Sequence, residues 1–142
     1  IEFMPFQDNK WNMSHIVPEK QIIQTLETSY VLKPLVNGQH DTSRKFSINQ
    51  ATTIGFISSI TNPFCGGCNR MRLTADGKLK NCLFSNDELD LLAAHRSGAD
   101  LKPLVKKHML KKHFARGGKP SFSEDGAEQT YQENRKMIAI GG

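Results

Sequence analysis

The chain has 142 residues, carries a net charge of +5 at pH 7 and is only 37% hydrophobic. That length suits about one domain, no run of about 18 apolar residues is present to span a membrane, and no leader peptide precedes a cleavage site. We therefore expect a soluble cytoplasmic protein without a membrane partner, whose positive charge favours anionic ligands but does not choose among nucleotides, nucleic acid and phosphates.

The first predicted elements are the end of a strand and a helix. Ile1–Phe6 is mostly apolar and begins without an initiator methionine, so we expect the C-terminal part of a longer protein, with a trimmed or matured N-terminus as the alternative. A polar loop over residues 7–14 follows. Pro18 suits the first turn of a helix that has one apolar face and ends near Tyr30.

The middle of the chain has the composition of β-structure. Residues 33–43 predict a loop, while Arg44–Ile48 and Thr52–Ile60 are rich in β-branched and aromatic residues and predict strands. Further on, the short apolar runs Met71–Thr74 and Leu79–Phe84 flank an Asp-Gly pair, which is typical of a tight hairpin turn.

Two helices are predicted next. Ser85 and Glu88 have the spacing of a capping box for a helix that ends at Gly98. Asp100 can cap the following helix, which should end at Gly117. The polar residues 121–136 predict an extended or mobile segment. Residues 137–140 predict a last strand, before the final diglycine.

The three cysteines, Cys65, Cys68 and Cys82, lie in one segment, FCGGCNRMRLTADGKLKNCL. An odd number of clustered thiols favours metal binding over a disulfide framework. The predicted hairpin would carry Cys82 back beside the other two. Three thiolates are one short of the four in a closed iron–sulfur or zinc site. Either another ligand comes from elsewhere, or one coordination position is open to a substrate.

Two arginines lie inside this cysteine segment. Arg70 and Arg72 are two residues apart on a predicted strand, so their side chains should share one face. Guanidinium groups bind phosphate oxygens in bidentate fashion, which suggests an anionic substrate held against the metal. A solvated pair on an exposed strand is the alternative.

A zinc site is the competing interpretation of the cysteines. His95 is the nearest candidate for a fourth ligand in sequence, although a lone histidine on a helix face is more often a packed side chain. The basic stretch 101–123 could contact nucleic acid, but it has almost no aromatic residues and is more typical of the solvated face of a helix. The alternative function is therefore a non-catalytic, zinc-stabilised module that binds nucleic acid.

The segment CGGCNRMRLTADGKLKNCLF resembles, nearly position for position, the C-terminal cluster motif of the GTP 3′,8-cyclase family, radical S-adenosylmethionine (SAM) enzymes of molybdenum cofactor biosynthesis. The resemblance extends to Glu2–Phe6, to Gly55–Ile60 and to the terminal diglycine. It implies an α+β fold. In it, residues 1–30 close an incomplete α/β (radical SAM) barrel, and residues 31–142 form a C-terminal [4Fe–4S] and GTP-binding region with a β-hairpin, helices and a diglycine tail.

The resemblance also implies roles for individual residues. Cys65, Cys68 and Cys82 would ligate three irons of a [4Fe–4S] cluster whose open fourth iron meets the guanine of GTP. The remaining implied roles are GTP binding by Arg70, Met71 and Arg72, SAM contact by Met4, and a catalytic tail formed by Gly141 and Gly142.

The implied reaction converts GTP to (8S)-3′,8-cyclo-7,8-dihydroguanosine 5′-triphosphate. In the family, SAM is cleaved at a second [4Fe–4S] cluster held by a CxxxCxxC motif, which these 142 residues do not contain. We therefore expect the chain alone to be inactive. The expected partners are GTP and the pterin synthase that acts next in the pathway, with a homodimer as an option and no nucleic acid.

Overall fold

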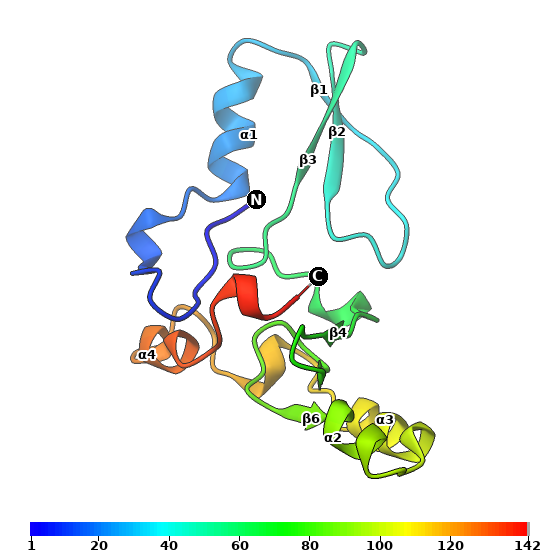
Figure 1. Cartoon of the computed structure of the whole chain (residues 1–142). Helices are drawn as coiled ribbons and strands as arrows, with labels where there is room; N and C mark the ends of the chain where they lie inside the picture. Colours follow the sequence, from blue (N-terminus) through cyan, green and yellow to red (C-terminus); the bar gives the residue numbers. More distant parts are fainter. Residues whose placement is uncertain (142) are drawn as a thin grey trace. The chain divides into compact units, whose positions relative to one another are not determined.

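The computed structural model describes residues 1–141, and the chain divides into two compact units. Unit 1 comprises Ile1–Met4 and Met13–Cys68, and unit 2 comprises Pro5–Asn12 and Asn69–Gly142. Each unit combines helix with one three-stranded antiparallel sheet, in the orders β1-β2-β3 and β4-β5-β6 (Figure 1). The predicted α+β class is therefore confirmed. Across the described residues, no helix has the length and apolar composition needed to cross a membrane.

Unit 1 contains two short 3₁₀ turns, one α-helix and three strands. These are the turns Met13–His15 and Cys65–Gly67, helix α1 at Glu19–Glu27, and strands β1 at Leu32–Pro34, β2 at Arg44–Ile48 and β3 at Thr52–Phe56. Helix α1 begins directly after Pro18 and ends short of Tyr30. The bounds predicted for β2 are confirmed, whereas β3 stops at Phe56 instead of Ile60.

The loop predicted at residues 33–43 is wrong at its start, because Lys33 and Pro34 belong to strand β1. The cause is a contact distant in sequence. Asn49, in the β2–β3 turn, accepts a hydrogen bond from Val31 N at 2.8 Å through its side chain and donates its own N–H to Val31 O at 2.9 Å. Pro34 is compatible with β1 because β1 is an edge strand.

The N-terminal residues Ile1–Phe6 do not form the predicted strand. Instead, Glu2 is a buried carboxylate that organises the loop after β3. It accepts hydrogen bonds from Ile60 N at 2.7 Å and from Thr61 N at 3.0 Å, together with one from the Thr61 hydroxyl. A buried carboxylate needs such donors because an unpaired buried charge is costly. The loop fixed in this way leads into Cys65.

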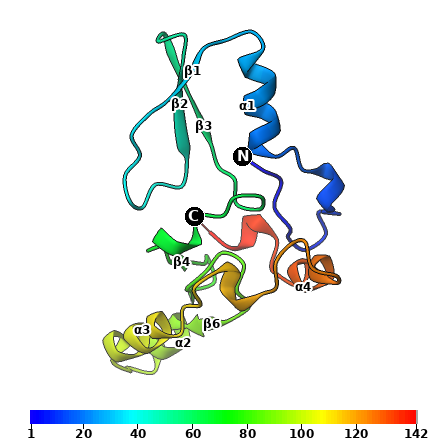
Figure 2. The same ribbon diagram turned by 180° about the vertical axis from the view of Figure 1, so that it is seen from behind.

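Within the described residues, unit 2 contains three short strands and three α-helices. Figure 2 shows the same ribbon from behind. The strands are β4 at Arg72–Leu73, β5 at Lys78–Lys80 and β6 at Glu88–Asp90. The helices are α2 at Leu91–Arg96, α3 at Leu101–Leu110 and α4 at Ala127–Gln132. Two 3₁₀ turns, Arg116–Gly118 and Met137–Ala139, complete the unit.

The predicted hairpin is confirmed as β4–β5, with shorter strands than expected. Gly77 lies in its turn with a φ of 77°, a conformation that glycine adopts at little cost. Thr74 N donates to Lys78 O at 2.9 Å, and Lys78 N donates to the Thr74 hydroxyl at 2.9 Å. In the resulting register, Arg72 pairs with Lys80.

The capping box predicted at Ser85 and Glu88 is wrong. Glu88 begins strand β6, and helix α2 is capped by Asp90, whose side chain accepts a hydrogen bond from Ala93 N at 2.8 Å. Capping-box spacing describes only local hydrogen bonding. The Glu88 carboxylate instead forms ion pairs with cations elsewhere in unit 2, described below.

Of the remaining helix boundaries, the end of α2 and the start of α3 are as predicted, and the end of α3 is not. Gly98 follows the end of α2 with a φ of 76°. Asp100 caps α3 by accepting a hydrogen bond from Lys102 N at 3.0 Å. The prediction that this helix continues to Gly117 is wrong, because α3 ends at Leu110.

The core of unit 2 is an aromatic cluster that was not predicted. The rings of Phe122 and Tyr131 stack with centroids 4.3 Å apart, and Phe84 packs edge-on against them at 5.6 and 5.5 Å. The Trp11 ring lies 5.8 Å from that of Phe122. Tyr131 lies on α4, so the extended or mobile segment predicted at 121–136 is wrong. The segment is polar apart from a few residues, and its two aromatic side chains are buried in the core.

The predicted last strand is also wrong. Met137–Ala139 forms a 3₁₀ turn, and Ile140 after it is 0% exposed. A single buried side chain therefore replaces the alternating pattern of a strand. Of the final diglycine, Gly141 is described and Gly142 lies outside the described residues.

Candidate functional site

Cys65 and Cys68 belong to a tight turn in unit 1. Residues Cys65–Gly67 form a 3₁₀ turn in which Cys68 N donates to Cys65 O at 3.0 Å. Gly67 faces the loop before β2: a Cβ at this position would lie 2.7 Å from Gln39 O, and His40 Nδ1 lies 2.7 Å from Gly67 O. The absence of a side chain at Gly67 therefore lets the cysteine turn pack directly against the main chain.

The three cysteine side chains are half-buried, and none of them forms a disulfide in the described structure. Cys65 and Cys68 belong to unit 1 and Cys82 to unit 2, so the predicted meeting of their sulfurs stays a prediction. Within residues 1–141, no group of three or more His, Cys, Asp and Glu side chains is arranged to hold a metal ion. His95, the candidate fourth zinc ligand, is exposed on α2.

Two lysines provide positive charge near Cys82. Burial lowers the pKa of Lys80 and of Lys119, and the nearby carboxylates, Glu88 for Lys80 and Glu133 for Lys119, act in the opposite direction. Both lysines place positive charge in the part of unit 2 that carries Cys82. Cysteine sulfur is the ligand that iron–sulfur clusters require, so three half-buried thiols outside any disulfide are a donor set that fits such a group.

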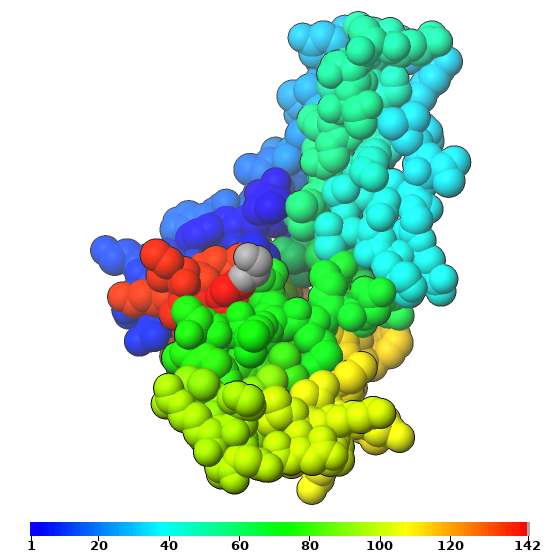
Figure 3. All heavy atoms as spheres, turned by 45° about the vertical axis from the view of Figure 1, so that its right-hand side comes forward, coloured from blue at the N-terminus to red at the C-terminus, as the bar shows by residue number. Residues whose placement is uncertain are grey.

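Arg72 contacts the C-terminal end of the chain. Its Nη1 donates a hydrogen bond to Gly141 O at 2.7 Å. Gly141 has a φ of 72°, and a Cβ at this position would lie 2.5 Å from Leu73 O, so the backbone of the tail packs directly on strand β4. Figure 3 shows the C-terminal part of the chain, in red, against the green part of unit 2. The structure thus brings together Arg72 and Gly141, two residues that the sequence resemblance had assigned to separate roles.

Arg70 and Met71 precede β4 and are half-buried. Arg72 pairs with Lys80, two residues before Cys82. The arginine pair and the third cysteine therefore lie in and beside one hairpin. Met4 is half-buried in unit 1, and its role towards SAM stays a prediction.

Lys112 joins the two arms of this hairpin at its base. Its Nζ donates to Arg70 O at 2.8 Å and also to Asn81 O. The buried side chain of Asn81 donates in turn to His108 O on α3 at 3.2 Å. Lys112 therefore holds both the arginine segment and the residue before Cys82. The sequence did not single it out, because it is one of several lysines in a basic stretch.

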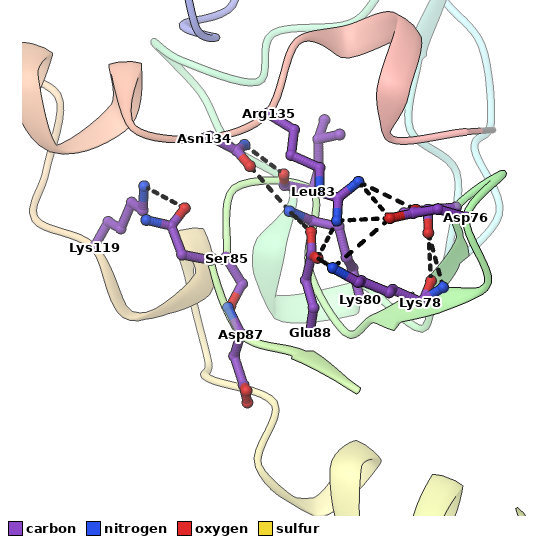
Figure 4. A network of polar contacts seen from close by, with 12 residues as sticks. Asp76, Lys78, Lys80, Leu83, Ser85, Asp87, Glu88, Lys119, Asn134 and Arg135 are labelled. Atoms are coloured by element: carbon purple, nitrogen blue, oxygen red, sulfur yellow. Dashed lines mark hydrogen bonds and ion pairs between the residues drawn. The ribbon is translucent and has the colours of Figure 1, made fainter. Parts of the chain in front are cut away.

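An ion-pair network covers the turn of the hairpin (Figure 4). Arg135 donates to the two carboxylate oxygens of Asp76 at 3.1 and 3.0 Å and to Glu88 at 2.7 Å. Hydrogen bonds from Thr74 and Arg135 lower the pKa of Asp76 to about 2, while those to Asp76 and Glu88 raise the pKa of Arg135. The Lys80 and Lys78 ammonium groups lie 3.4 and 3.8 Å from Glu88, which therefore offsets the charge of three cations.

Asn134 extends this network into the buried part of unit 2. Its Nδ2 donates to Leu83 O at 2.8 Å, and its Oδ1 accepts from Lys80 Nζ at 2.9 Å. Its backbone oxygen accepts from Gln7 N at 3.0 Å. The sequence predicted no role for Asn134 or Arg135, because the partners of both residues are remote in the chain. An Asn-Arg pair in a polar segment also carries no recognisable pattern.

Comparison with known proteins places the chain in a family. The family model described as Molybdenum Cofactor Synthesis C matches residues 1–116. The chain is 35% identical to the mitochondrial GTP 3′,8-cyclase of Arabidopsis thaliana, over 100% of the chain and 36% of that protein. It is 32% identical to GTP 3′,8-cyclase of Aquifex aeolicus, over 100% of the chain and 42% of that protein.

A further relative is molybdenum cofactor biosynthesis protein 1 of Mus musculus, with 38% identity over 99% of the chain and 22% of the mouse protein. The chain thus spans less than half the length of these relatives. Both the family model and the relatives nevertheless cover most or all of the chain. The chain therefore belongs to the Molybdenum Cofactor Synthesis C family and corresponds to the C-terminal portion of the GTP 3′,8-cyclases.

Proposed function

We propose that this chain is the substrate-binding, C-terminal part of a GTP 3′,8-cyclase of molybdenum cofactor biosynthesis. In this proposal, Cys65, Cys68 and Cys82 hold a [4Fe–4S] cluster with one open iron. GTP is held by Arg70, Met71 and Arg72. SAM cleavage and its own cluster belong to the rest of the enzyme, with Met4 contributing to the SAM side. The names of the relatives support the GTP cyclase assignment.

The observation that carries this proposal is the hydrogen bond from Arg72 to Gly141 O at 2.7 Å. It links an arginine of the cysteine segment to the tail, as expected if both border one substrate. The bond uses one of the five N–H donors of the guanidinium group, and the others suit the oxygens of a triphosphate. Such a site would select an anion over a neutral nucleoside.

The residues around the cysteines have separate tasks in this proposal. When bound, a cluster with an open iron supplies a Lewis-acidic position for the guanine base. Lys80 and Lys119 supply positive charge in the part of unit 2 that carries Cys82, and Lys112 joins the two arms of the hairpin. Positioning is the main contribution, since a misplacement of about 1 Å can cost ~10²-fold in rate.

The first test is anaerobic reconstitution of the chain with iron and sulfide, followed by electron paramagnetic resonance of the reduced protein with and without GTP. We expect a four-iron signal that shifts when GTP is added. A colourless protein that retains one zinc ion and is indifferent to GTP would contradict the proposal and favour a structural zinc module.

Arginine variants separate nucleotide binding from cluster binding. Arg72→Ala should weaken GTP binding by about tenfold or more, because a charge-assisted contact is lost, and should leave the iron content unchanged. Arg96→Ala is the control, since Arg96 is exposed on α2 of the same unit. Loss of the cluster with unchanged GTP affinity would overturn the role given to Arg72.

The isolated chain should not cleave SAM reductively. With dithionite as reductant, we expect no 5′-deoxyadenosine above the background of free iron and sulfide. Formation of 5′-deoxyadenosine by these 142 residues would show that they contain a radical-generating centre, which this proposal assigns to the remainder of the enzyme.

A further inference from the structure

The C-terminal segment, residues 135–141, contacts the β4–β5 hairpin at two separate places. Arg135 binds Asp76 in the hairpin turn through both carboxylate oxygens, as Figure 4 shows. Gly141 O then accepts a hydrogen bond from Arg72, on the first strand of the same hairpin. The stretch between these contacts therefore has both of its ends on the element that carries Arg72.

The residues between Arg135 and Gly141 form a compact turn. Ala139 N donates to Lys136 O at 2.9 Å, and Ile140 N donates to Met137 O at 3.1 Å, which shortens the chain into a 3₁₀ turn. Ile140, directly before Gly141, is 0% exposed. The stretch from Arg135 to Gly141 is therefore short and closed by its own hydrogen bonds, so its two ends are joined through this one turn.

We propose that Arg135 is a positioning residue: by binding Asp76 and Glu88 it fixes the start of the C-terminal segment and so sets where Gly141 meets Arg72. This inference rests on the proposed function, in which Arg72 holds GTP. The guanidinium fork matches the carboxylate of Asp76 in bidentate fashion, which the single ammonium of a lysine cannot do. Arg135 itself does not touch the substrate.

The competing role for Arg135 is simple stabilisation by a surface ion pair. Exposed ion pairs contribute little to stability on average, and what they contribute is spread over the whole folded unit. A positioning role instead affects one segment. Local and global effects on amide exchange therefore separate the two roles.

The test is hydrogen–deuterium exchange of the whole chain, followed by mass spectrometry. In Arg135→Gln, the peptide that contains residues 137–141 should exchange about tenfold faster, while α4 and β5 keep their protection. Arg135→Lys should give an intermediate rate. Lys136→Gln is the matched control: Lys136 is the adjacent cation, and its exposed Nζ pairs with Asp8 at 2.9 Å instead of with the hairpin.

A second variant approaches the same contact from the hairpin. Asp76→Asn should also accelerate exchange of residues 137–141. The double variant with Arg135→Gln should exchange no faster than Arg135→Gln alone, because Arg135→Gln already removes the contact with Asp76. Additive effects of the two substitutions, unchanged exchange, or an equal rise across all of unit 2 would each overturn the positioning role.

GTP binding to the reconstituted chain completes the test. Arg135→Gln should weaken GTP binding about fivefold at unchanged iron content, as expected when the tail no longer supports Arg72. Unchanged affinity despite a released tail would overturn the link to the substrate. If the unmodified chain does not bind GTP at all, the proposed function fails, while the exchange result still decides whether Arg135 anchors the tail.

Discussion

Gly67 is the residue at which the cysteine turn meets another backbone. A Cβ there would lie 2.7 Å from Gln39 O, and both partners belong to the main chain. Gly67→Ala should therefore lower the free energy of unfolding by about 1–3 kcal/mol, the usual cost of overpacking, as measured by urea denaturation. Gly55→Ala is the control, because its Cβ would meet Ser43 at an ordinary 3.5 Å. Equal losses in both variants would contradict this account.

Asp76 gives the ion-pair network a pH dependence. Hydrogen bonds from Thr74 and Arg135 lower its pKa from 3.8 to about 2. Because the folded-state pKa is depressed, the contribution of Asp76 to stability is complete above its ordinary pKa and is lost as the pH falls towards 2. The difference in unfolding free energy between the unmodified chain and Asp76→Asn should therefore be constant near neutral pH and shrink below about pH 4. A difference that persists unchanged at about pH 2 would contradict this assignment.

At the scale of elements, the β4–β5 hairpin depends on Lys112. Lys112→Met keeps most of the side chain but removes the hydrogen bonds to Arg70 O and Asn81 O. We expect a loss of about 1–3 kcal/mol in unfolding free energy, because hydrogen bonds to charged groups are among the stronger ones. Lys111→Met, at an exposed neighbouring position, should have little effect in the same urea titration. Comparable losses in the two variants would show that Lys112 does not hold the hairpin.

Elements whose causes are local could be predicted from the sequence. The Asp76-Gly77 pair predicted the hairpin because the turn needs the positive φ that glycine supplies, and Asp100 predicted the start of α3 through its own side chain. Elements with distant causes could not. The capping-box interpretation of Glu88 failed because its carboxylate binds Arg135, far along the chain.

The candidate site divides in the same way. The cysteines and the two arginines were recognised from their spacing, which is a property of the sequence. Lys112, Asn134 and Arg135 were not, since each acts through partners that only the fold of unit 2 brings near. Positioning residues of this kind have no motif of their own.

At the scale of the whole molecule, the proposed cluster would bind all three cysteines of the chain, Cys65, Cys68 and Cys82. A group that binds the folded chain and not the unfolded chain stabilises it by mass action. Loading with iron and sulfide should therefore raise the midpoint of thermal unfolding by at least about 5 °C. The rise should disappear in Cys82→Ser and persist in His95→Ala. Loss of the rise in His95→Ala would favour the zinc site instead.

The burial of four residues in the polar segment 121–136 sets its tolerance to genetic variation. Judged by composition, this segment resembles a linker in which most substitutions would be neutral. Phe122, Ala127, Tyr131 and Asn134 are 5%, 1%, 0% and 1% exposed, so variants at these positions should be depleted as strongly as those in an ordinary core. Their exposed neighbours should vary freely. A map of tolerated substitutions would therefore show isolated constrained positions in a permissive background, and through Ala127 and Tyr131 it would trace the inner face of α4 without any structural measurement.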